Sequence, residues 1–133
     1  MIGYHATSME NRESILNEGF SIEKQGENES HLGNGIYLAS TKTLARQYGK
    51  YLVTVEFDES KLFHLTDWIK EYREKCREVF NNGVDERGVN KVVGEYYKEF
   101  YTSQGYNGLI MDGIVGTSKE IVIYDIKSIK NIY

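Results

Sequence analysis

Two spacings of apolar residues alternate along the chain, a two-residue period that is typical of strands and a three- to four-residue period that is typical of helices. The clearest strand is predicted over residues 51–57, where β-branched and aromatic residues dominate. Shorter apolar segments predict further strands over residues 2–7, 35–39, 109–111 and 121–124, with one more in the tail after residue 126. The predicted strands are therefore spread over the whole chain.

Helices are predicted in the intervals between these strands, and two of them are short. Ser8 provides an N-cap for the first, which ends at Gly19. Ser40 or Thr41 caps a brief second helix, which we expect to run through Tyr48. Between the two, residues 21–34 are polar and rich in glycine and asparagine, so this segment is predicted to be a loop.

Two longer amphipathic helices are predicted in the second half of the chain, over residues 66–80 and 88–103. The apolar face of the first is formed by Trp68, Ile69, Tyr72, Cys76, Val79 and Phe80. The apolar face of the second is formed by Val92, Val93, Tyr96, Tyr97 and Phe100. Helices and strands are mixed along the chain without a regular alternation, and this order predicts an α+β fold.

Composition indicates one ordinary globular domain, which we assign to residues 1–133. Forty per cent of the residues are apolar and 27% are charged, which excludes a disordered chain. The excess of acidic side chains gives a net charge of −4. Such a charge disfavours binding of a long nucleic-acid duplex, but it is compatible with one small acidic cofactor.

The sequence contains few features that indicate a cellular compartment or a targeting signal. The single cysteine, Cys76, excludes internal disulfides and fits a reducing compartment. The first residues contain neither the charged nor the apolar segment of a secretion signal, and no apolar run approaches the roughly 20 residues of a membrane helix. We therefore expect a cytoplasmic protein, or one delivered into a target cell, without a membrane partner.

Candidate chemistry begins with His5, which lies in the first predicted strand. The small residues Ala6 and Thr7 follow it and would let a ligand approach the backbone closely. A histidine in a strand is also typical of a core or edge residue whose hydrogen bonds are satisfied within the protein. His5 alone therefore leaves both interpretations open.

Two further segments carry aromatic and acidic candidates. Tyr37 lies in the sequence Gly-Ile-Tyr-Leu-Ala at residues 35–39, and Tyr48 follows on the next predicted helix. Two such rings suit the faces of a flat heterocycle, although half-buried structural tyrosines are common. Glu120 opens a very apolar strand, where a carboxylate is placed for an electrostatic role or is simply solvated.

Taken together, these segments resemble the signature of the ADP-ribosyltransferases of the poly(ADP-ribose) polymerase and diphtheria-toxin type. That signature is a histidine on the first strand, a tyrosine in a Gly-Ile-Tyr-like strand and a glutamate that opens a late strand, matched here by His5, Tyr37 and Glu120. The sequence Gly-Tyr-Asn-Gly-Leu-Ile at residues 105–110 resembles a strand of small bacterial and phage members. The resemblance implies two small, mainly antiparallel sheets that form a cleft for NAD, with helices outside.

The resemblance also implies a role for each matched residue. His5 would hydrogen-bond the adenosine ribose of NAD, and the backbone of Ala6 would hold the nicotinamide carboxamide. The rings of Tyr37 and Tyr48 would flank the nicotinamide, and Glu120 would hydrogen-bond the 2′-hydroxyl of its ribose. The catalytic residues implied are thus Glu120, His5 and Tyr37, and the NAD-binding residues implied are His5, Ala6, Thr7, Tyr37, Ala45, Tyr48 and Glu120.

The chain departs from the family pattern at positions that bear on the substrate. Ala6 stands where the family usually has glycine, and Ala45 stands where many relatives carry a serine. One nicotinamide contact is therefore either missing or supplied by another group, such as Thr41 or Thr43. Arginine-modifying relatives have a second glutamate two residues before the last one, where this chain has Ser118. Arginine is therefore a poor guess for the acceptor.

The activity implied is NAD-dependent transfer of a single ADP-ribose unit, with NAD as substrate and without a metal. The acceptor is left open between a protein, a nucleic acid and a small molecule. Small free-standing domains of this kind resemble toxins, toxin–antitoxin components or phage effectors, so a neutralising antitoxin is left open as a partner. The loop over residues 21–34 is hypothesised to close over bound NAD as a lid.

Two other functions were weighed. A non-catalytic module of the same fold would bind NAD or ADP-ribose without turnover, although a module of that kind is expected to have lost one of the three signature residues. The glycine and tyrosine pattern around Tyr37 and Tyr48 also resembles a metal-dependent GIY-YIG nuclease, but the segment between the tyrosines is predicted to be helical. No metal site is predicted from His5, His31, His64 and Cys76, since no pair has the spacing of metal ligands.

Overall fold

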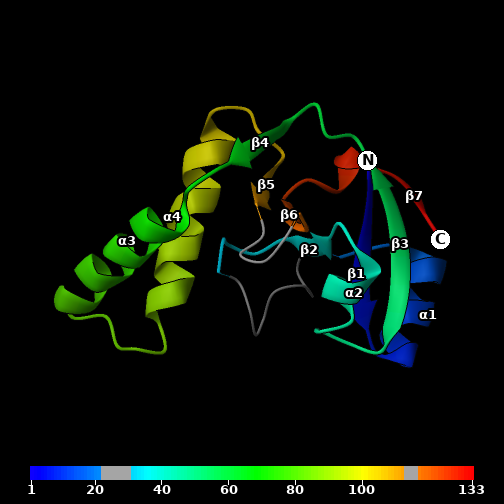
Figure 1. The fold of residues 1–133 in the computed structure, drawn as a ribbon, viewed down its shortest axis with the longest axis horizontal. Coiled ribbons are helices and arrows are strands. Elements are labelled where there is room, and N and C mark those ends of the chain that lie inside the picture. Colours follow the sequence, from blue (N-terminus) through cyan, green and yellow to red (C-terminus); the bar gives the residue numbers. More distant parts are fainter. Residues whose placement is uncertain (22–30, 113–116) are drawn as a thin grey trace.

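The computed structural model describes residues 1–21, 31–112 and 117–133, and confirms the α+β class (Figure 1). The loop expected to act as a lid lies largely outside the described residues, at 22–30. In chain order the elements are β1 (Ile2–Thr7), α1 (Met9–Glu18), β2 (Ile36–Ala39), α2 (Lys42–Ala45), β3 (Tyr51–Phe57), β4 (Leu62–Leu65), α3 (Ile69–Asn81), α4 (Val89–Ser103), β5 (Gly108–Asp112), β6 (Lys119–Ile123), the 3-10 helix η2 (Ile126–Ser128) and β7 (Ile129–Ile132).

The strands form one seven-stranded sheet in the order β4-β5-β6-β2-β1-β3-β7. All neighbours are antiparallel except β4 and β5, which are parallel. The expectation of two separate sheets is therefore wrong. The physical reason is that β2 pairs with β6 on one side and with β1 on the other, and so joins both halves.

β1 and β2 are paired over a much shorter length than the other neighbouring strands of the sheet. These strands are in register at Tyr4 and Ala39 alone among the described residues, whereas β1 is in register with β3 from Ile2 to Thr7. The two halves of the sheet therefore diverge on either side of one residue pair. We call this place the β1–β2 seam.

Capping residues determine where the two short helices begin, but the second helix ends earlier than predicted. Ser8 caps α1, because its side chain accepts a hydrogen bond of 3.2 Å from the backbone N–H of Asn11. Thr41 caps α2 by accepting from the N–H of Leu44. However, α2 ends at Ala45, so the expectation that it runs through Tyr48 is wrong, and Tyr48 lies in the bend that follows.

The second half of the chain contains a strand that the sequence pattern did not reveal. β4 holds only four residues, and its polar His64 is exposed, so its apolar pattern is too short to detect. Its backbone is instead held by parallel pairing with β5, with Leu62 opposite Gly108. Gly108 is required there, because a Cβ atom would lie 2.2 Å from the carbonyl oxygen of Val122. With β4 inserted, α3 begins at Ile69 rather than at residue 66.

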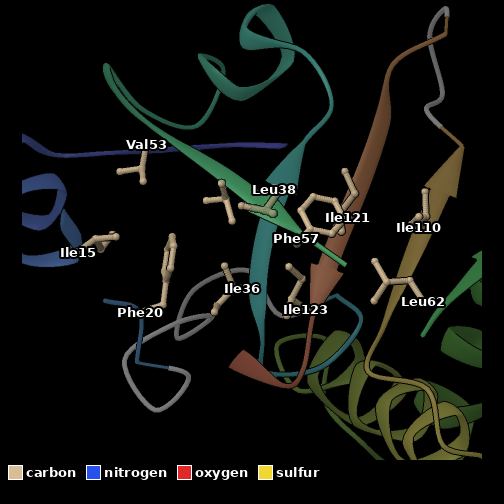
Figure 2. Packing of buried hydrophobic residues seen from close by; sticks show 11 residues of the cluster. Ile15, Phe20, Ile36, Leu38, Val53, Phe57, Leu62, Ile110, Ile121 and Ile123 are labelled. Carbon is tan, nitrogen blue, oxygen red and sulfur yellow. The ribbon is translucent and has the colours of Figure 1, made fainter. Parts of the chain in front are cut away.

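Apolar side chains gather on both faces of the sheet. On one face, Ile15 of α1 and Phe20 pack against the strands, as Figure 2 shows. On the other face, α4 packs against β5 and α3 packs against α4, and Tyr72, Val93 and Tyr97 form one apolar cluster with buried residues of β4, β5 and β6. The two clusters together explain why the strands from the middle of the sheet are buried on both sides.

The apolar faces predicted for the two long helices are only partly buried. Val93 and Tyr97 belong to the core, but Val92, Tyr96, Phe100 and Phe80 are exposed, which corrects the prediction. α4 lies between the sheet and α3, and each helix buries only part of its apolar face, so the neighbouring apolar residues reach solvent. None of the helices in the described part of the chain is both long and apolar enough to cross a membrane.

Candidate active site

The structure brings Tyr48 and Glu120 together from distant parts of the chain. Glu120 is the second residue of β6, where it lies opposite Ala39 of β2 and Met111 of β5. The hydroxyl of Tyr48 donates a hydrogen bond of 2.9 Å to Oε1 of Glu120. Since Tyr48 is 56% exposed, this pair lies at the surface, where a ligand can reach it.

Gly49 determines where Tyr48 lies. A Cβ atom at Gly49 would be 2.7 Å from the backbone nitrogen of Thr7 and 2.9 Å from the carbonyl carbon of Ala6. Only glycine allows the chain after α2 to approach the end of β1 this closely. The approach carries Tyr48 across from α2 and next to the backbone of Ala6 and Thr7.

The side chain of His5 occupies the β1–β2 seam. Its Nδ1 lies 3.0 Å from the carbonyl oxygen of Tyr37. A carbonyl oxygen only accepts, so Nδ1 carries the proton and donates it, and Nε2 of the neutral ring is left as an acceptor. Strand carbonyls point along the sheet toward the neighbouring strand, so the imidazole takes the place of the next backbone hydrogen bond between β1 and β2.

Burial keeps this imidazole uncharged. Loss of solvent lowers the pKa of His5, and the hydrogen bond with the backbone of Tyr37 opposes that effect only in part. The ring of Phe20 packs edge-on against the imidazole with the ring centroids 5.3 Å apart. His5 is therefore a neutral side chain in a fixed orientation, with one acceptor nitrogen available in the seam.

Tyr37 has a hydroxyl that is already bonded within the protein. It donates to the carbonyl oxygen of Gly33 at 2.5 Å and accepts from the N–H of Leu32 at 3.1 Å. Loss of solvent raises the pKa of the Tyr37 phenol well above its usual range. Tyr37 is therefore not suited to transfer a proton, and its half-buried ring packs against the apolar cluster that contains Tyr72 and Tyr97.

The predicted residues divide over the two faces of the sheet. Neighbouring residues of a strand point to opposite faces, and paired residues point to the same face. Tyr4, Ala39 and Glu120 are paired across β1, β2 and β6, so they share one face. Tyr37, two residues before Ala39, is on that face as well. His5 lies next to Tyr4 and reaches the site only through the seam.

The remaining predicted residues lie around the same end of β1. Ala6 has an ordinary backbone conformation, because Asp67 is the sole residue other than glycine with positive φ in the described ranges. Its backbone can therefore serve where the family has glycine. Thr7 is half-buried beside Gly49, and Ala45 is 2% exposed, so Ala45 faces the protein interior.

Two hydroxyl groups near Glu120 were not predicted as a pair. The Oγ1 atom of Thr41 and the Oγ atom of Ser118 are 3.3 Å apart, and Oγ of Ser40 accepts a hydrogen bond of 2.7 Å from the N–H of Lys119. These contacts fix the start of β6 against the end of β2. No sequence signal reveals them, because serine and threonine side chains are common and the partners lie far apart along the chain.

Other candidate chemistry is not assembled in the described residues. No three His, Cys, Asp or Glu side chains of residues 1–21, 31–112 and 117–133 are grouped so that they could hold a metal ion. His31 and His64 are exposed, and Cys76 is half-buried. β2 pairs with β1 and β6, and Tyr48 is outside any strand, so Tyr37 and Tyr48 do not lie on two paired strands.

Comparison with known proteins gives no relative: no protein-family model matches the chain, and no curated protein matches it either. A function has to be inferred from the arrangement of the side chains. The described contacts join Tyr48 to Glu120 on one face of the sheet, and join His5 to the carbonyl oxygen of Tyr37 at the β1–β2 seam.

Proposed function

We propose that this protein is an NAD-dependent mono-ADP-ribosyltransferase with an ADP-ribosyltransferase-like fold, in which the β1–β2 seam is the NAD-binding cleft. The observation that carries the proposal is the hydrogen bond of 2.9 Å from Tyr48 to Glu120 beside this seam. It joins two residues that the sequence resemblance assigns to the nicotinamide half of NAD. Their meeting in space is what that assignment requires.

Glu120 supplies the main electrostatic effect. When the bond between nicotinamide and ribose breaks, positive charge develops on the ribose, as in glycoside hydrolysis. A carboxylate that hydrogen-bonds the 2′-hydroxyl stabilises this charge more in the transition state than in the ground state. The bond from Tyr48 holds the carboxylate in one orientation, so little reorganisation is needed during the reaction.

His5 and the aromatic residues bind NAD without exchanging protons with it. Nε2 of the neutral His5 accepts a hydrogen bond from a hydroxyl of the adenosine ribose, and the Ala6 backbone holds the carboxamide. The Tyr37 ring flanks the nicotinamide while its hydroxyl stays bonded to Gly33. The Tyr48 ring lies at the opposite side of the ligand, and Thr7 completes the wall, whereas the buried Ala45 does not reach the ligand.

The reaction balances without a metal or an added oxidant. The C1′–N bond of NAD breaks, and its electron pair leaves with nicotinamide as a neutral molecule. A lone pair on the acceptor forms the new bond to C1′, and the acceptor loses one proton to solvent. Because nicotinamide leaves uncharged, the site needs orientation and exclusion of water more than acid catalysis.

The direct test is release of nicotinamide from NAD by wild-type protein and by Glu120→Gln. The substitution keeps the shape and an oxygen that accepts from Tyr48, and removes only the charge. We expect the rate to fall by about 10²- to 10³-fold, which is the usual cost of losing one electrostatic partner. Glu59→Gln, at an exposed position after β3, is the matched control and should keep the wild-type rate.

Two outcomes would contradict the proposal. One is a rate of release by Glu120→Gln that equals the wild-type rate. The other is a wild-type protein that binds NAD, as seen by an increase in melting temperature, but releases no nicotinamide. The second outcome would instead support a binding module of the same fold.

A further inference from the structure

A second place on the molecule combines a cavity with unpaired charge. It is a cavity of about 650 Å³ at the ends of β4 and β5 and the beginning of α3. Basic side chains of α3 form one wall, namely Lys70, Arg73 and Arg77. Asp67 and Asp112, at the ends of the two strands, contribute carboxylates, and Trp68 contributes an aromatic wall. None of the residues proposed to bind NAD lines this cavity.

Helical periodicity places the three basic side chains together. They occupy positions i, i+3 and i+7 of α3, which lie on one side of a helix. The glutamates of α3 have the same spacing one residue further on, at Glu71, Glu74 and Glu78, and so lie on an adjoining side. The helix thus turns these three positive side chains toward the cavity, whereas its fourth cation, Lys75, lies over the ring of Tyr96.

These basic side chains have no partner among the described residues. Within the ranges that the structure describes, Lys70, Arg73 and Arg77 make neither a hydrogen bond nor an ion pair with another residue. Arginine side chains held close together without carboxylate partners repel one another, and an anion relieves this repulsion. The planar guanidinium group binds the oxygens of phosphate with two parallel hydrogen bonds.

The backbone adds to the positive potential at the same place. α3 is 13 residues long, and no side chain caps its N-terminus at Trp68. The first amide groups of the helix therefore remain available as donors, and the helix dipole is positive at this end. Lys70 lies in this first turn, so the side-chain and backbone donors face the same space.

The cavity and Glu120 lie at the same end of strands β4, β5 and β6. Leu65 of β4 is opposite Met111 of β5, and Met111 is opposite Glu120 of β6. Two strand spacings separate β4 from β6, a distance of about 10 Å. Asp67 and Trp68 lie two and three residues after the end of β4, so the cavity begins near the proposed reaction centre.

We propose that this cavity binds a phosphate-bearing nucleotide, and that the nucleotide belongs to the ADP-ribose acceptor. The binding claim stands on the cavity and its unpaired cations, whereas the acceptor role rests on the proposed function. The basic side chains of α3 hold the phosphate. Asp67 and Asp112 accept hydrogen bonds from sugar hydroxyls or base amino groups of the same ligand, which inorganic phosphate lacks.

Binding is tested by NMR titration of the ¹⁵N-labelled chain with uridine 5′-monophosphate, with uridine and with inorganic phosphate. We expect uridine 5′-monophosphate to shift the amide resonances of residues 69–73 and to bind at least about tenfold more tightly than either of the other two, because the charge-assisted hydrogen bonds and the sugar contacts are both needed. Saturating NAD should leave this binding intact.

The matched variants are Arg73→Gln with Arg77→Gln, and, as control, Lys127→Gln with Lys130→Gln at the exposed far end of the sheet. Both pairs remove two positive charges. The first pair should weaken the binding of uridine 5′-monophosphate at least about tenfold, and the second should change it less than about twofold.

Four results would overturn the proposal: equal affinity for uridine or for inorganic phosphate, unchanged affinity of the α3 variant, equal weakening in the control, or displacement by NAD. Displacement would mean that the cavity holds the dinucleotide itself. Because these titrations need no turnover, they remain decisive even if nicotinamide release fails, and that failure would remove only the acceptor role.

Discussion

The hydrogen bond between Tyr48 and Glu120 is the feature on which the site depends at the residue scale. A carboxylate next to three apolar strand residues would be free to rotate if it were solvated on its own. The phenol at 2.9 Å restricts it to one orientation, and it does so with a neutral donor that leaves the negative charge intact. Orientation and charge are thus supplied by different residues.

Tyr48→Phe separates these two contributions. It keeps the ring that would flank nicotinamide and removes the hydrogen bond to Glu120. We expect the maximal rate of nicotinamide release to fall about three- to tenfold, with little change in KM for NAD, because a hydrogen bond of this kind contributes about 1 kcal/mol. Tyr51→Phe, at a half-buried tyrosine of β3, is the control for loss of a phenol hydroxyl. A wild-type rate for Tyr48→Phe would contradict the orienting role.

The sequence could identify candidate residues but not their contacts. His5, Tyr37 and Glu120 were chosen because their residue types and strand contexts match a known signature. The bond from His5 to the Tyr37 carbonyl was beyond prediction, because it depends on the divergence of β1 from β2. The cations of α3 were also missed, since a helix with mixed charges is usually a solvated surface.

At the scale of elements, the site is made by the way in which α2 and the chain after it return to β1. The helix is only one turn long, and its cap, Thr41, also contacts Ser118 at the start of β6. Gly49 then lies against the peptide between Ala6 and Thr7. Three elements are therefore held together within a few residues on each side of the seam.

Gly49→Ala tests this arrangement. A methyl group 2.7 Å from the Thr7 nitrogen must push the chain away from β1, at a cost of about 1–3 kcal/mol in unfolding free energy. We expect the displaced Tyr48 to lose Glu120, so nicotinamide release falls as well. Chemical denaturation and the release assay measure the two effects.

Gly83→Ala serves as the control, because it is expected to reduce the unfolding free energy by about as much as Gly49→Ala does. It creates no contact within 4 Å, but its φ of +101° strains an alanine at a cost of about 1–3 kcal/mol. Because Gly83 lies in the loop after α3, its substitution should leave release unchanged. Equal losses of activity in both variants would mean that stability alone, and not the position of Tyr48, controls the rate.

The elements themselves were largely predictable where a pattern was long. The strand over residues 51–57 and both long helices are present with small shifts of their ends. β4 was missed because four residues carry too little pattern, and its existence depends on pairing with β5. The exposure of Val92, Tyr96 and Phe100 on the apolar face of α4 could not be predicted, because the sequence does not show how wide a face of this helix the rest of the protein covers.

At the scale of the whole molecule, the two halves of the sheet form one continuous sheet because one residue pair joins β1 to β2. The expected pair of sheets and the observed single sheet differ only at this seam, and no local pattern distinguishes them. The seam also buries His5, and this burial links the protonation of one side chain to the stability of the whole fold.

Stability should therefore decrease in mild acid. Folding lowers the pKa of His5, so the folded protein binds a proton at this side chain less readily than the unfolded chain does. In the unfolded chain the pKa of histidine is about 6.5. The contribution of neutral His5 to the free energy of unfolding is fully present above that pH. It is lost as the pH falls through the pKa that His5 has in the folded protein. Denaturation midpoints measured between about pH 7.5 and pH 5 should fall for wild-type protein.

His5→Gln should flatten this dependence, because the amide donates to the Tyr37 carbonyl but does not titrate in this range. His64→Gln, at the exposed histidine of β4, is the control and should keep the wild-type slope. A slope in His5→Gln equal to that of wild-type protein would show that other groups cause the acid sensitivity, and that His5 is not held neutral in the seam.

The central claim is that the protein opens the bond between nicotinamide and ribose in NAD. It is tested most directly by incubating the protein with NAD that carries one label in nicotinamide and another in the adenylate group, and by separating the products. The account predicts free nicotinamide in an amount equal to the NAD consumed, with the adenylate label recovered as intact ADP-ribose or on an acceptor. Unchanged NAD, or release of AMP from a cleaved diphosphate, would contradict it.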